Sequence, residues 1–160
     1  MTSRPGPLTG IRVLDLSRVL SGPIAGRNLH DLGAEVIKLE PPGEGDIARA
    51  WGVRTHGGES SYFVNLHRNK RGIVIDLKKP EGKALFFKLI EKCDVVLENY
   101  RVGALKKLGL DYEEAKKRNP GIIYASISGF GQDGPYRDRA ALDLILQSES
   151  GMVSVTGDEG

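Results

Sequence analysis

Basic residues follow four apolar segments of this sequence, each about the length of a β-strand. The residues after these segments read SRVLSGP (17–23), DLKKPEG (76–82), ENYRVGALKKLG (98–109) and SGFGQDGPYRDR (128–139). All four contain Lys or Arg together with Gly or other polar residues. Ligands of parallel α/β sheets bind at the carboxyl ends of the strands. A row of cations at that edge predicts an anionic ligand that is longer than a single phosphate.

The elements that would position these residues begin with a βαβ unit over residues 12–40. Its first strand is expected over 13–16 and its second over 36–39, with a helix that begins at Ser21-Gly22-Pro23 and ends at Gly33. We expect Ser21 to cap the helix, and Pro23 suits the first turn because it has no N–H to satisfy there. A helix N-terminus at the carboxyl end of a parallel strand is suited to phosphate binding.

A nicotinamide or flavin dinucleotide is the first ligand to consider for such a unit, but the turn disfavours it. The turn reads S-G-P-x-x-G over 21–26 and not G-x-G-x-x-G. Glu40 does stand at the end of the second strand, where an acid that binds ribose would lie. One acid without the glycines is weak support for this ligand.

The rest of the chain continues the alternation of strands and helices. Further strands are expected over 72–77, 95–98 and 122–127, and helices over 80–93, 112–119 and 141–151. Residues 41–60 are predicted to form a long loop rich in Gly, Pro and charge, and residues 62–66 form a short alternating segment. This order predicts an α/β domain with a mainly parallel sheet.

The composition is that of an ordinary soluble globular domain. The chain has 160 residues, of which 39% are hydrophobic and 28% are charged. Its net charge of +2 is too small to indicate a nucleic-acid partner. We find no apolar run long enough for a signal peptide or a membrane span, so we expect no membrane partner.

The cysteine and the histidines carry little chemistry in this reading. Cys93 is the single cysteine, so a disulfide within the chain is excluded and a reducing compartment, the cytoplasm, is expected. We expect Cys93 to be a small buried hydrophobic residue. The three histidines are isolated, with His30 on a helix and His56 and His67 in loops, and no pair has the spacing of metal ligands. No metal is therefore expected.

Six segments, in order and at matching spacing, resemble the class III CoA-transferase family of the CaiB/BaiF type. They are LDLSRVLSGP (14–23), LGAEVIKLEPPGEGD (32–46), NKRGIVIDLKKPEG (69–82), CDVVLENYRVGALKKLGLDY (93–112), NPGIIYASISGFGQDGPY (119–136) and SESGMVSVTG (148–157). The resemblance implies a Rossmann-like domain over 8–160, as the N-terminal part of a larger CoA-transferase fold. It also implies a smaller second domain beyond the chain end and an interlocked homodimer.

The ligand implied by the resemblance is coenzyme A, bound as an acyl-CoA substrate and not as a tightly held cofactor. Carried over by motif, the contact residues form three groups and one single residue. Arg18, Leu20 and Ser21 would approach the pantetheine arm and the thioester, Leu77 and Lys78 would line the adenine and phosphate region, Asn99, Tyr100 and Arg101 would contact the nucleotide and pantetheine, and Lys107 would lie near a phosphate.

The reaction implied by the resemblance is transfer of CoA from an acyl-CoA to a free carboxylic acid through an aspartyl-CoA thioester. In the family the nucleophilic aspartate lies just past an SGxxxxTG motif, which here is 150–157. The aspartate is therefore expected beyond Gly160, and no catalytic residue is expected in this chain, which resembles an N-terminal fragment. Asp143 is interpreted as a helix N-terminal acid that shapes the site.

Two alternatives stay open at this point. An acyl-CoA racemase of the same superfamily would need a histidine in a G-H-D motif, where this chain has Ala141-Leu142-Asp143, and a leucine exchanges no proton. The segment at 55–71 is also longer than in the racemases, which further favours a transferase. The second alternative is a non-catalytic CoA-binding module. The acyl donor and the acceptor acid are not identified by the sequence.

Overall fold

The computed structural model describes residues 5–157, which contain a five-stranded, all-parallel β-sheet. The strands are β1 (Arg12–Asp15), β2 (Glu35–Glu40), β3 (Arg71–Val74), β4 (Val95–Glu98) and β5 (Ile123–Ser126). Their order across the sheet is β3-β2-β1-β4-β5. The predicted α/β class with a parallel sheet is confirmed. The last three residues of the predicted domain, 158–160, lie outside the described residues.

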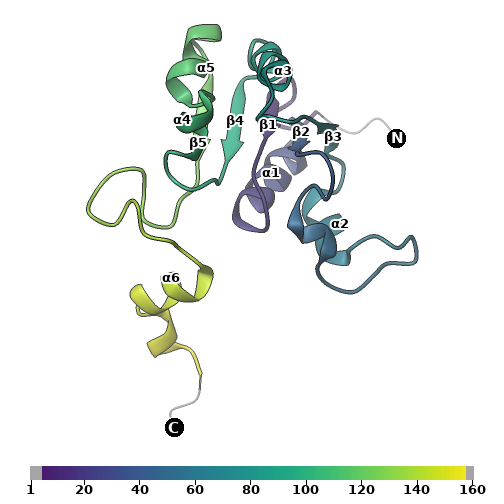
Figure 1. Ribbon diagram of the computed structural model, residues 1–160. Coiled ribbons are helices and arrows are strands. Elements are labelled where there is room, and N and C mark those ends of the chain that lie inside the picture. Colours follow the sequence, from purple (N-terminus) through teal and green to yellow (C-terminus); the bar gives the residue numbers. More distant parts are fainter. Residues whose placement is uncertain (1–4, 158–160) are drawn as a thin grey trace.

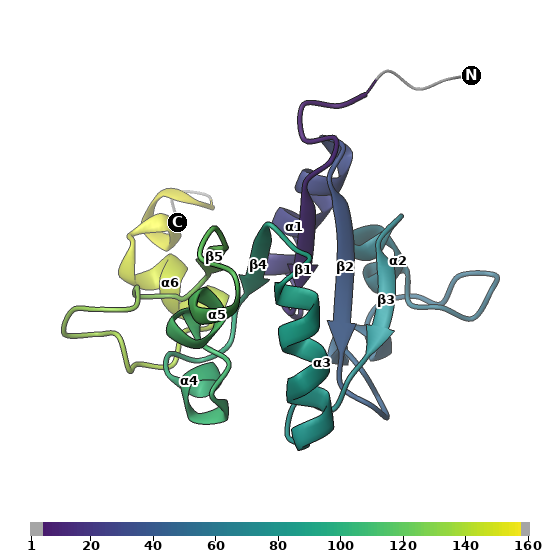
Figure 2. The same cartoon turned by 90° about the horizontal axis from the view of Figure 1, so that it is seen from above.

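Helices cover both faces of the sheet (Figure 1). They are α1 (Ser21–Asp31), α2 (Ser61–His67), α3 (Pro80–Ile90), α4 (Ala104–Leu108), α5 (Tyr112–Arg118) and α6 (Asp143–Glu149), with the 3₁₀ helices η1 (Ile47–Ala50) and η2 (Met152–Val155). Helices α3, α4 and α5 lie on one face, and α1 and α2 lie on the other (Figures 1 and 2). A sheet covered on both faces explains why consecutive residues of its central strands are both apolar, such as Val13 and Leu14 in β1 and Val96 and Leu97 in β4.

The two faces of the sheet bury separate hydrophobic clusters because successive strand side chains point in opposite directions. Leu14 of β1 packs in the cluster beneath α3, together with Phe86 and Ile90 of that helix, and all three are fully buried. Val13, the preceding residue, belongs to the cluster on the α1 side, where Leu29 packs. The sheet is thereby held between two apolar layers.

The strand order places a topological switch point between β1 and β4. From β1 the chain moves outward to β2 and β3, and then crosses back to add β4 and β5 on the other side of β1. Asp15 at the end of β1 pairs with Leu97 of β4. The loops that leave these two strands therefore diverge from neighbouring points, which opens a crevice where ligands of such sheets bind.

Several local predictions were wrong or incomplete. Strand β3 ends at Val74 and not at residue 77, and residues 62–66 lie in helix α2, whose N-terminus is capped by Ser60. The loop predicted over 41–60 contains η1, and helix α4 was not predicted at all. Ser21 does not cap α1, since Leu20 is at the cap position and no side chain bonds to the free N–H groups there.

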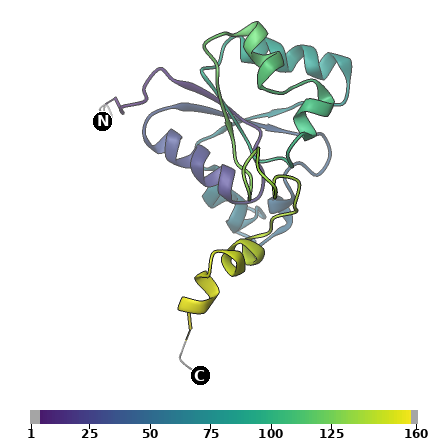
Figure 3. The same ribbon diagram turned by 90° about the vertical axis from the view of Figure 1, so that its left-hand side faces the viewer.

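The C-terminal segment leaves the body of the domain (Figures 1 and 3). Helix α6 has no buried residue, and apolar side chains such as Leu144 and Val155 are exposed.

Cys93 is buried as predicted, with a free thiol. Among the residues described, none of the helices combines the length and the apolar character that crossing a membrane requires.

We expect Phe86→Ala to lower the free energy of unfolding by about 3–5 kcal/mol, because it removes a fully buried ring from the cluster beneath α3. Leu85→Ala is the matched control, since Leu85 is the preceding residue of the same helix but is 48% exposed. Its cost should be about 1 kcal/mol or less. Urea unfolding measures both values, and similar costs for the two variants would show that the buried face of α3 is assigned wrongly.

Candidate functional site

The turn after β1 is tied to neighbouring elements through its own backbone. The side-chain carbonyl of Asn99, just after β4, accepts a hydrogen bond from the Arg18 N–H at 2.8 Å, and the Asn99 amide donates to the Arg18 carbonyl at 2.8 Å. One residue earlier, the Lys38 ammonium of β2 donates to the Ser17 carbonyl. The turn therefore cannot move without breaking bonds to both strands that flank β1.

Asp46 holds the next residue of the turn. The Val19 N–H donates to both oxygens of this carboxylate at 3.3 Å, and Lys38 pairs with it at 3.1 Å. The Asp46 side chain is fully buried and also caps η1 by accepting from the Ala48 N–H at 3.1 Å. A buried carboxylate needs this many partners, because an unpaired charge in the interior is costly.

A second buried ion pair lies beside the first. Lys70 contacts the Asp15 carboxylate at 2.8 Å, and both side chains are almost completely buried. The Lys70 ammonium also donates to the Pro23 carbonyl at 3.0 Å, which ties the segment before β3 to the first turn of α1. Burial lowers the pKa of Lys70, and the Asp15 charge opposes that effect.

His67 lies between the two pairs and is neutral at pH 7. Burial lowers its pKa to about 4, and the charges of Lys70 and Lys38 act in the same direction. Its Nδ1 lies 3.3 Å from the Lys70 ammonium, which can only donate, so we assign the imidazole proton to Nε2. The Nε2 atom is 3.8 Å from the Asp46 carboxylate. His67 was predicted in a loop, and instead it is buried in α2, stacked on Phe63.

The other two histidines show no such environment. His30 lies on α1 as expected, and its Nδ1 is 3.1 Å from the Ala34 carbonyl. His56 is exposed in a loop. Within residues 5–157, His, Cys, Asp and Glu side chains form no group of three that could hold a metal ion.

Glu40 is committed to a structural role. Arg49 donates to its two oxygens at 2.8 and 2.7 Å, and the Asp46 N–H donates at 3.0 Å. Burial acts to raise the pKa of Glu40, but these hydrogen bonds outweigh it and lower the pKa to about 2. Since both oxygens are already engaged by the protein, Glu40 is not placed to accept bonds from a ribose, which further disfavours a dinucleotide.

A cavity of about 780 Å³ lies at the switch point beside this turn. It is walled by the turn after β1, the loop after β4, the loop that leads to α6, and two aromatic side chains from the segment after β2. The residues that line it include Val19, Leu20, Ser21, Trp51, Tyr62, Asn99, Tyr100, Arg101, Ile127, Gly129, Phe130, Arg137, Arg139, Leu142 and Asp143. Apolar walls with arginines among them suit a ligand that has an uncharged arm and anionic groups.

Most of the predicted binding residues come together at this cavity. Leu20, Ser21, Asn99, Tyr100 and Arg101 all line it. They were predicted from the motifs of the family resemblance, and for Asn99 and Arg101 the position just past a buried strand supported the prediction. Trp51 and Tyr62 line the cavity too but were not predicted, because no motif marks them and only the folding of η1 and α2 brings them there.

The other four predicted binding residues are not on the cavity wall. Arg18 is half-buried, and its Nε is a buried atom with no hydrogen-bond partner in the described part of the chain. Leu77 is buried in the cluster beneath α3. Lys78 and Lys107 are exposed. Their contacts with a ligand stay predictions.

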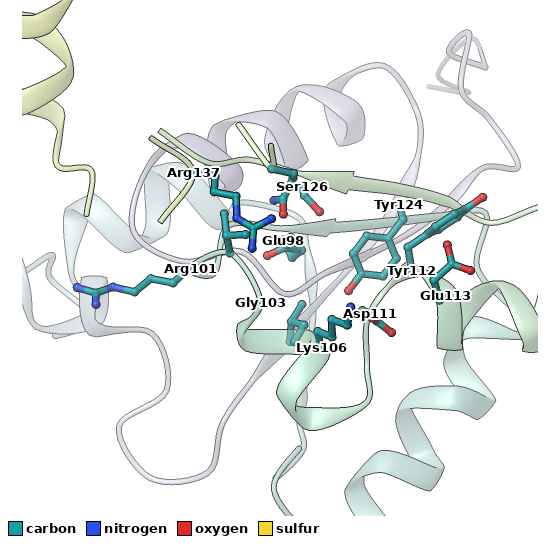
Figure 4. A pocket seen from close by; sticks show the side chains of 13 residues that line it. Glu98, Arg101, Gly103, Lys106, Asp111, Tyr112, Glu113, Tyr124, Ser126 and Arg137 are labelled. Carbon is teal, nitrogen blue, oxygen red and sulfur yellow. The ribbon is translucent and has the colours of Figure 1, made fainter. Parts of the chain in front are cut away.

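A second cavity, of about 560 Å³, lies beyond Arg101 between the ends of β4 and β5 and helices α4 and α5 (Figure 4). Arg101 and Arg137 line both cavities. Figure 4 shows Arg101 pointing away from the other labelled side chains. Burial raises the pKa of Glu98, which accepts a hydrogen bond from the Tyr100 N–H at 2.7 Å. This cavity mixes both signs of charge and so indicates no particular ligand.

Asp143 opens helix α6 and lies on the wall of the larger cavity, next to Leu142. Its carboxylate accepts a hydrogen bond from Gln147 one turn later. The position agrees with the predicted helix N-terminal acid, while its part in shaping a bound acyl group stays a prediction.

Comparison with known proteins gives concordant matches. The model of CoA-transferase family III matches residues 8–160. The succinate–glutarate CoA-transferase of Agrobacterium fabrum is 51% identical over 164 residues, which cover 99% of this chain and 41% of that protein. The acetyl-CoA:oxalate CoA-transferase of Acetobacter aceti is 47% identical over 152 residues, covering 95% and 39%.

A solved structure agrees with these matches. The crystal structure of a CaiB/BaiF family protein from Brucella suis is 45% identical and has a TM-score of 0.91, with 97% of this chain and 42% of that chain covered. The chain thus spans well under half the length of the relatives that it matches.

We expect His67 to reduce stability in mild acid. Its pKa is about 4 in the folded protein and 6.5 for an unperturbed histidine. The unfolded state therefore binds more protons between these values, so the stabilisation is complete above pH 6.5 and is lost as the pH falls toward 4. Over this window the wild type should lose on the order of 3 kcal/mol more unfolding free energy than His67→Gln.

Urea unfolding at a series of pH values measures this difference. His56→Gln is the control, because His56 is exposed and should leave the pH profile of the wild type unchanged. An identical pH profile for His67→Gln and the wild type would show that the imidazole is not held neutral.

Proposed function

This chain belongs to CoA-transferase family III, and from that premise we propose that the protein transfers CoA from an acyl-CoA to a free carboxylic acid. The observation that carries the proposal is the cavity at the switch point, where the predicted residues of the turn after β1 and the loop after β4 meet. The relatives named above are transferases whose names include a CoA ester or a dicarboxylic acid.

The chemistry of the cavity suits an acyl-CoA. The pantetheine arm is long and uncharged, and Leu20, Tyr100 and Trp51 offer apolar surface for such an arm. The CoA phosphates and the acceptor carboxylate are anions, and Arg101 and Arg137 offer guanidinium groups that bind such anions through charge-assisted hydrogen bonds. We propose that CoA binds as a substrate that enters and leaves, and is not held as a cofactor.

We propose the covalent route that the family resemblance implies. An aspartate carboxylate attacks the thioester carbonyl, the C–S bond breaks, and the CoA thiolate leaves a mixed anhydride. The thiolate then attacks the aspartyl carbonyl of that anhydride, which releases the donor acid and forms an aspartyl-CoA thioester. The acceptor carboxylate then attacks the aspartyl-CoA thioester and releases the CoA thiolate, which forms a second mixed anhydride. The thiolate attacks the acceptor carbonyl of that anhydride, which gives the new CoA ester and frees the aspartate. We propose that this aspartate lies beyond Gly160.

The position of Leu142 supports a transferase over a racemase. Leu142 lies on the cavity wall at the N-cap of α6, and its side chain carries no exchangeable proton. The buried histidine of the fold, His67, is not on that wall, and burial keeps its imidazole neutral by lowering the pKa to about 4. A non-catalytic CoA-binding module is the remaining alternative, and an activity measurement separates it from an enzyme.

We further propose that residues 8–160 are part of the large CoA-binding domain of an interlocked homodimer. The exposed apolar side chains of α6 and η2, among them Leu144, Val153 and Val155, support this proposal. In such a dimer they would be covered by the remainder of the chain or by the second copy, whereas in this segment alone they face solvent.

We expect the full-length protein to form a new CoA ester from succinyl-CoA and glutarate, or from acetyl-CoA and oxalate. Mass spectrometry of the CoA esters detects the product. During turnover, hydroxylamine should attack the aspartyl-CoA thioester, release CoA and leave an aspartyl hydroxamate outside residues 1–160. CoA binding without transfer to any carboxylic acid would favour the binding module, and a trapped adduct on Asp143 would contradict the proposed position of the nucleophile.

We expect Arg101→Ala to weaken CoA binding by about 1–3 kcal/mol if Arg101 makes a charge-assisted contact with CoA, which is about a five- to 150-fold increase in Kd. Arg71→Ala is the control, since Arg71 opens β3 at the opposite edge of the sheet and its contact with Glu35 is exposed. Titration calorimetry with CoA measures both. An unchanged affinity in folded Arg101→Ala would remove this residue from the site.

A further inference from the structure

Val19 has a backbone conformation that its side chain disfavours. Its φ is +70°, in the left-handed region, where a β-branched residue is rarely found. Asn69 is the other residue besides glycine with positive φ in the described chain, and asparagine accepts this region more readily. Such a conformation persists only where the surroundings fix it, and it is often found next to functional sites.

The surroundings of Val19 fix it through hydrogen bonds from three separate elements to three consecutive residues. Lys38 of β2 bonds to the Ser17 carbonyl. Asn99 after β4 bonds to both backbone groups of Arg18, and Asp46 before η1 accepts from the Val19 N–H. Each of these three residues is therefore held by a hydrogen bond to a different element.

The Asp46 anchor acts directly on the left-handed residue. Its carboxylate is buried, so water cannot replace it as the partner of the Val19 N–H. Leu20 and Ser21 follow directly and lie on the cavity wall, where the thioester is expected. A change of φ at Val19 would turn the chain at that point and displace both residues relative to the loop after β4.

Overall stability is a weak explanation for this arrangement. A buried ion pair such as Lys38–Asp46 is often no more stabilising than well-packed apolar residues of similar size, because both charges lose their hydration. The same cost is accepted again at Asp15–Lys70, directly beside it. Two such pairs under one turn are better explained by the conformation that they impose.

We propose that Asp46 is a positioning residue of the acyl-CoA site: by holding Val19 in the left-handed conformation, it sets where Leu20 and Ser21 stand on the cavity wall. This proposal rests on the proposed CoA-transfer function. Asp46 itself does not line the cavity, so its effect passes through Val19.

The test compares variants of the full-length protein. Asp46→Asn is expected to lower kcat/KM for the acyl-CoA at least tenfold, because the neutral amide is a weaker acceptor for the Val19 N–H. Glu44→Gln is the matched control, as it makes the same kind of change at an exposed residue of the same loop, and its kcat/KM should stay within twofold of the wild type.

A second substitution separates positioning from stability. Glycine adopts positive φ without strain, so Val19→Gly in the Asp46→Asn background is expected to recover at least threefold of the lost kcat/KM. The unfolding temperature should recover little, because the strain that glycine relieves in the folded state is offset by the higher entropy that it gives the unfolded chain. No recovery of kcat/KM would overturn the proposal, as would an Asp46→Asn variant as active as the wild type.

If Asp46→Asn does not fold, Asp46→Glu takes its place. The glutamate keeps a negative charge beside Lys38 but moves its oxygens away from the Val19 N–H, and the same loss and the same rescue by Val19→Gly are expected. Absence of CoA transfer in the wild type would instead contradict the proposed function. In that case the positioning role is tested by the Kd for CoA of the wild type, Glu44→Gln, Asp46→Asn and the double variant with Val19→Gly. Asp46→Asn should bind CoA most weakly, the double variant should recover part of the loss, and Glu44→Gln should match the wild type.

Discussion

The turn after β1 depends on charge buried beneath it, and the candidate site depends on that turn. Lys38 and Asp46 bond to its backbone, and Asp15 and Lys70 form the floor next to them. In water these ions would be fully hydrated, so they stay buried only because each is paired and also hydrogen-bonded. The pairing joins β1, β2, the segment before β3 and the first turn of α1 into one unit. The cavity is the space between this unit and the loop after β4.

The sheet brings the two sides of this cavity together through its order alone. Strands β1 and β4 are far apart in the sequence but adjacent in the sheet. The loops that follow them therefore leave the same edge of the sheet and diverge. Asn99 then closes the gap at one point, since it follows β4 and bonds to Arg18, which follows β1. One amide thus joins the turn after β1 to the loop after β4, and it does so between residues 81 positions apart in the sequence.

The sequence predicts the apolar part of this structure better than the charged part. The apolar segments identified every strand and most helices. The residues that become buried in a strand, such as Val13, Leu14 and Val96, belong to short apolar runs that can be recognised in the sequence itself. The short α4 was missed because two glycines at positive φ, Gly103 and Gly109, define it rather than a long periodic face. The buried ions were missed for a different reason. Lys70 stands in the basic segment RNKR, which resembles a solvated loop, and its partner Asp15 is 55 positions away. No periodicity connects such residues, and only the tertiary fold pairs them.

The charge balance of the buried cluster also connects its acid response to the site. Lys38, Lys70, Asp15 and Asp46 sum to zero, and His67 keeps that balance only while it is neutral. A proton on His67 would add a third positive charge between two lysines. The charged imidazole would then compete with the existing partners of Asp46, whose carboxylate lies 3.8 Å away. The Val19 N–H and Lys38 share that same carboxylate. Acid would therefore act first on the hydrogen bonds that shape the turn. Burial raises the pKa values of Cys93, Tyr100 and Tyr124, which pack in the apolar layer beneath α3, so these groups stay protonated and neutral in acid. The loss of geometry at the cavity wall would then come before the loss of the core.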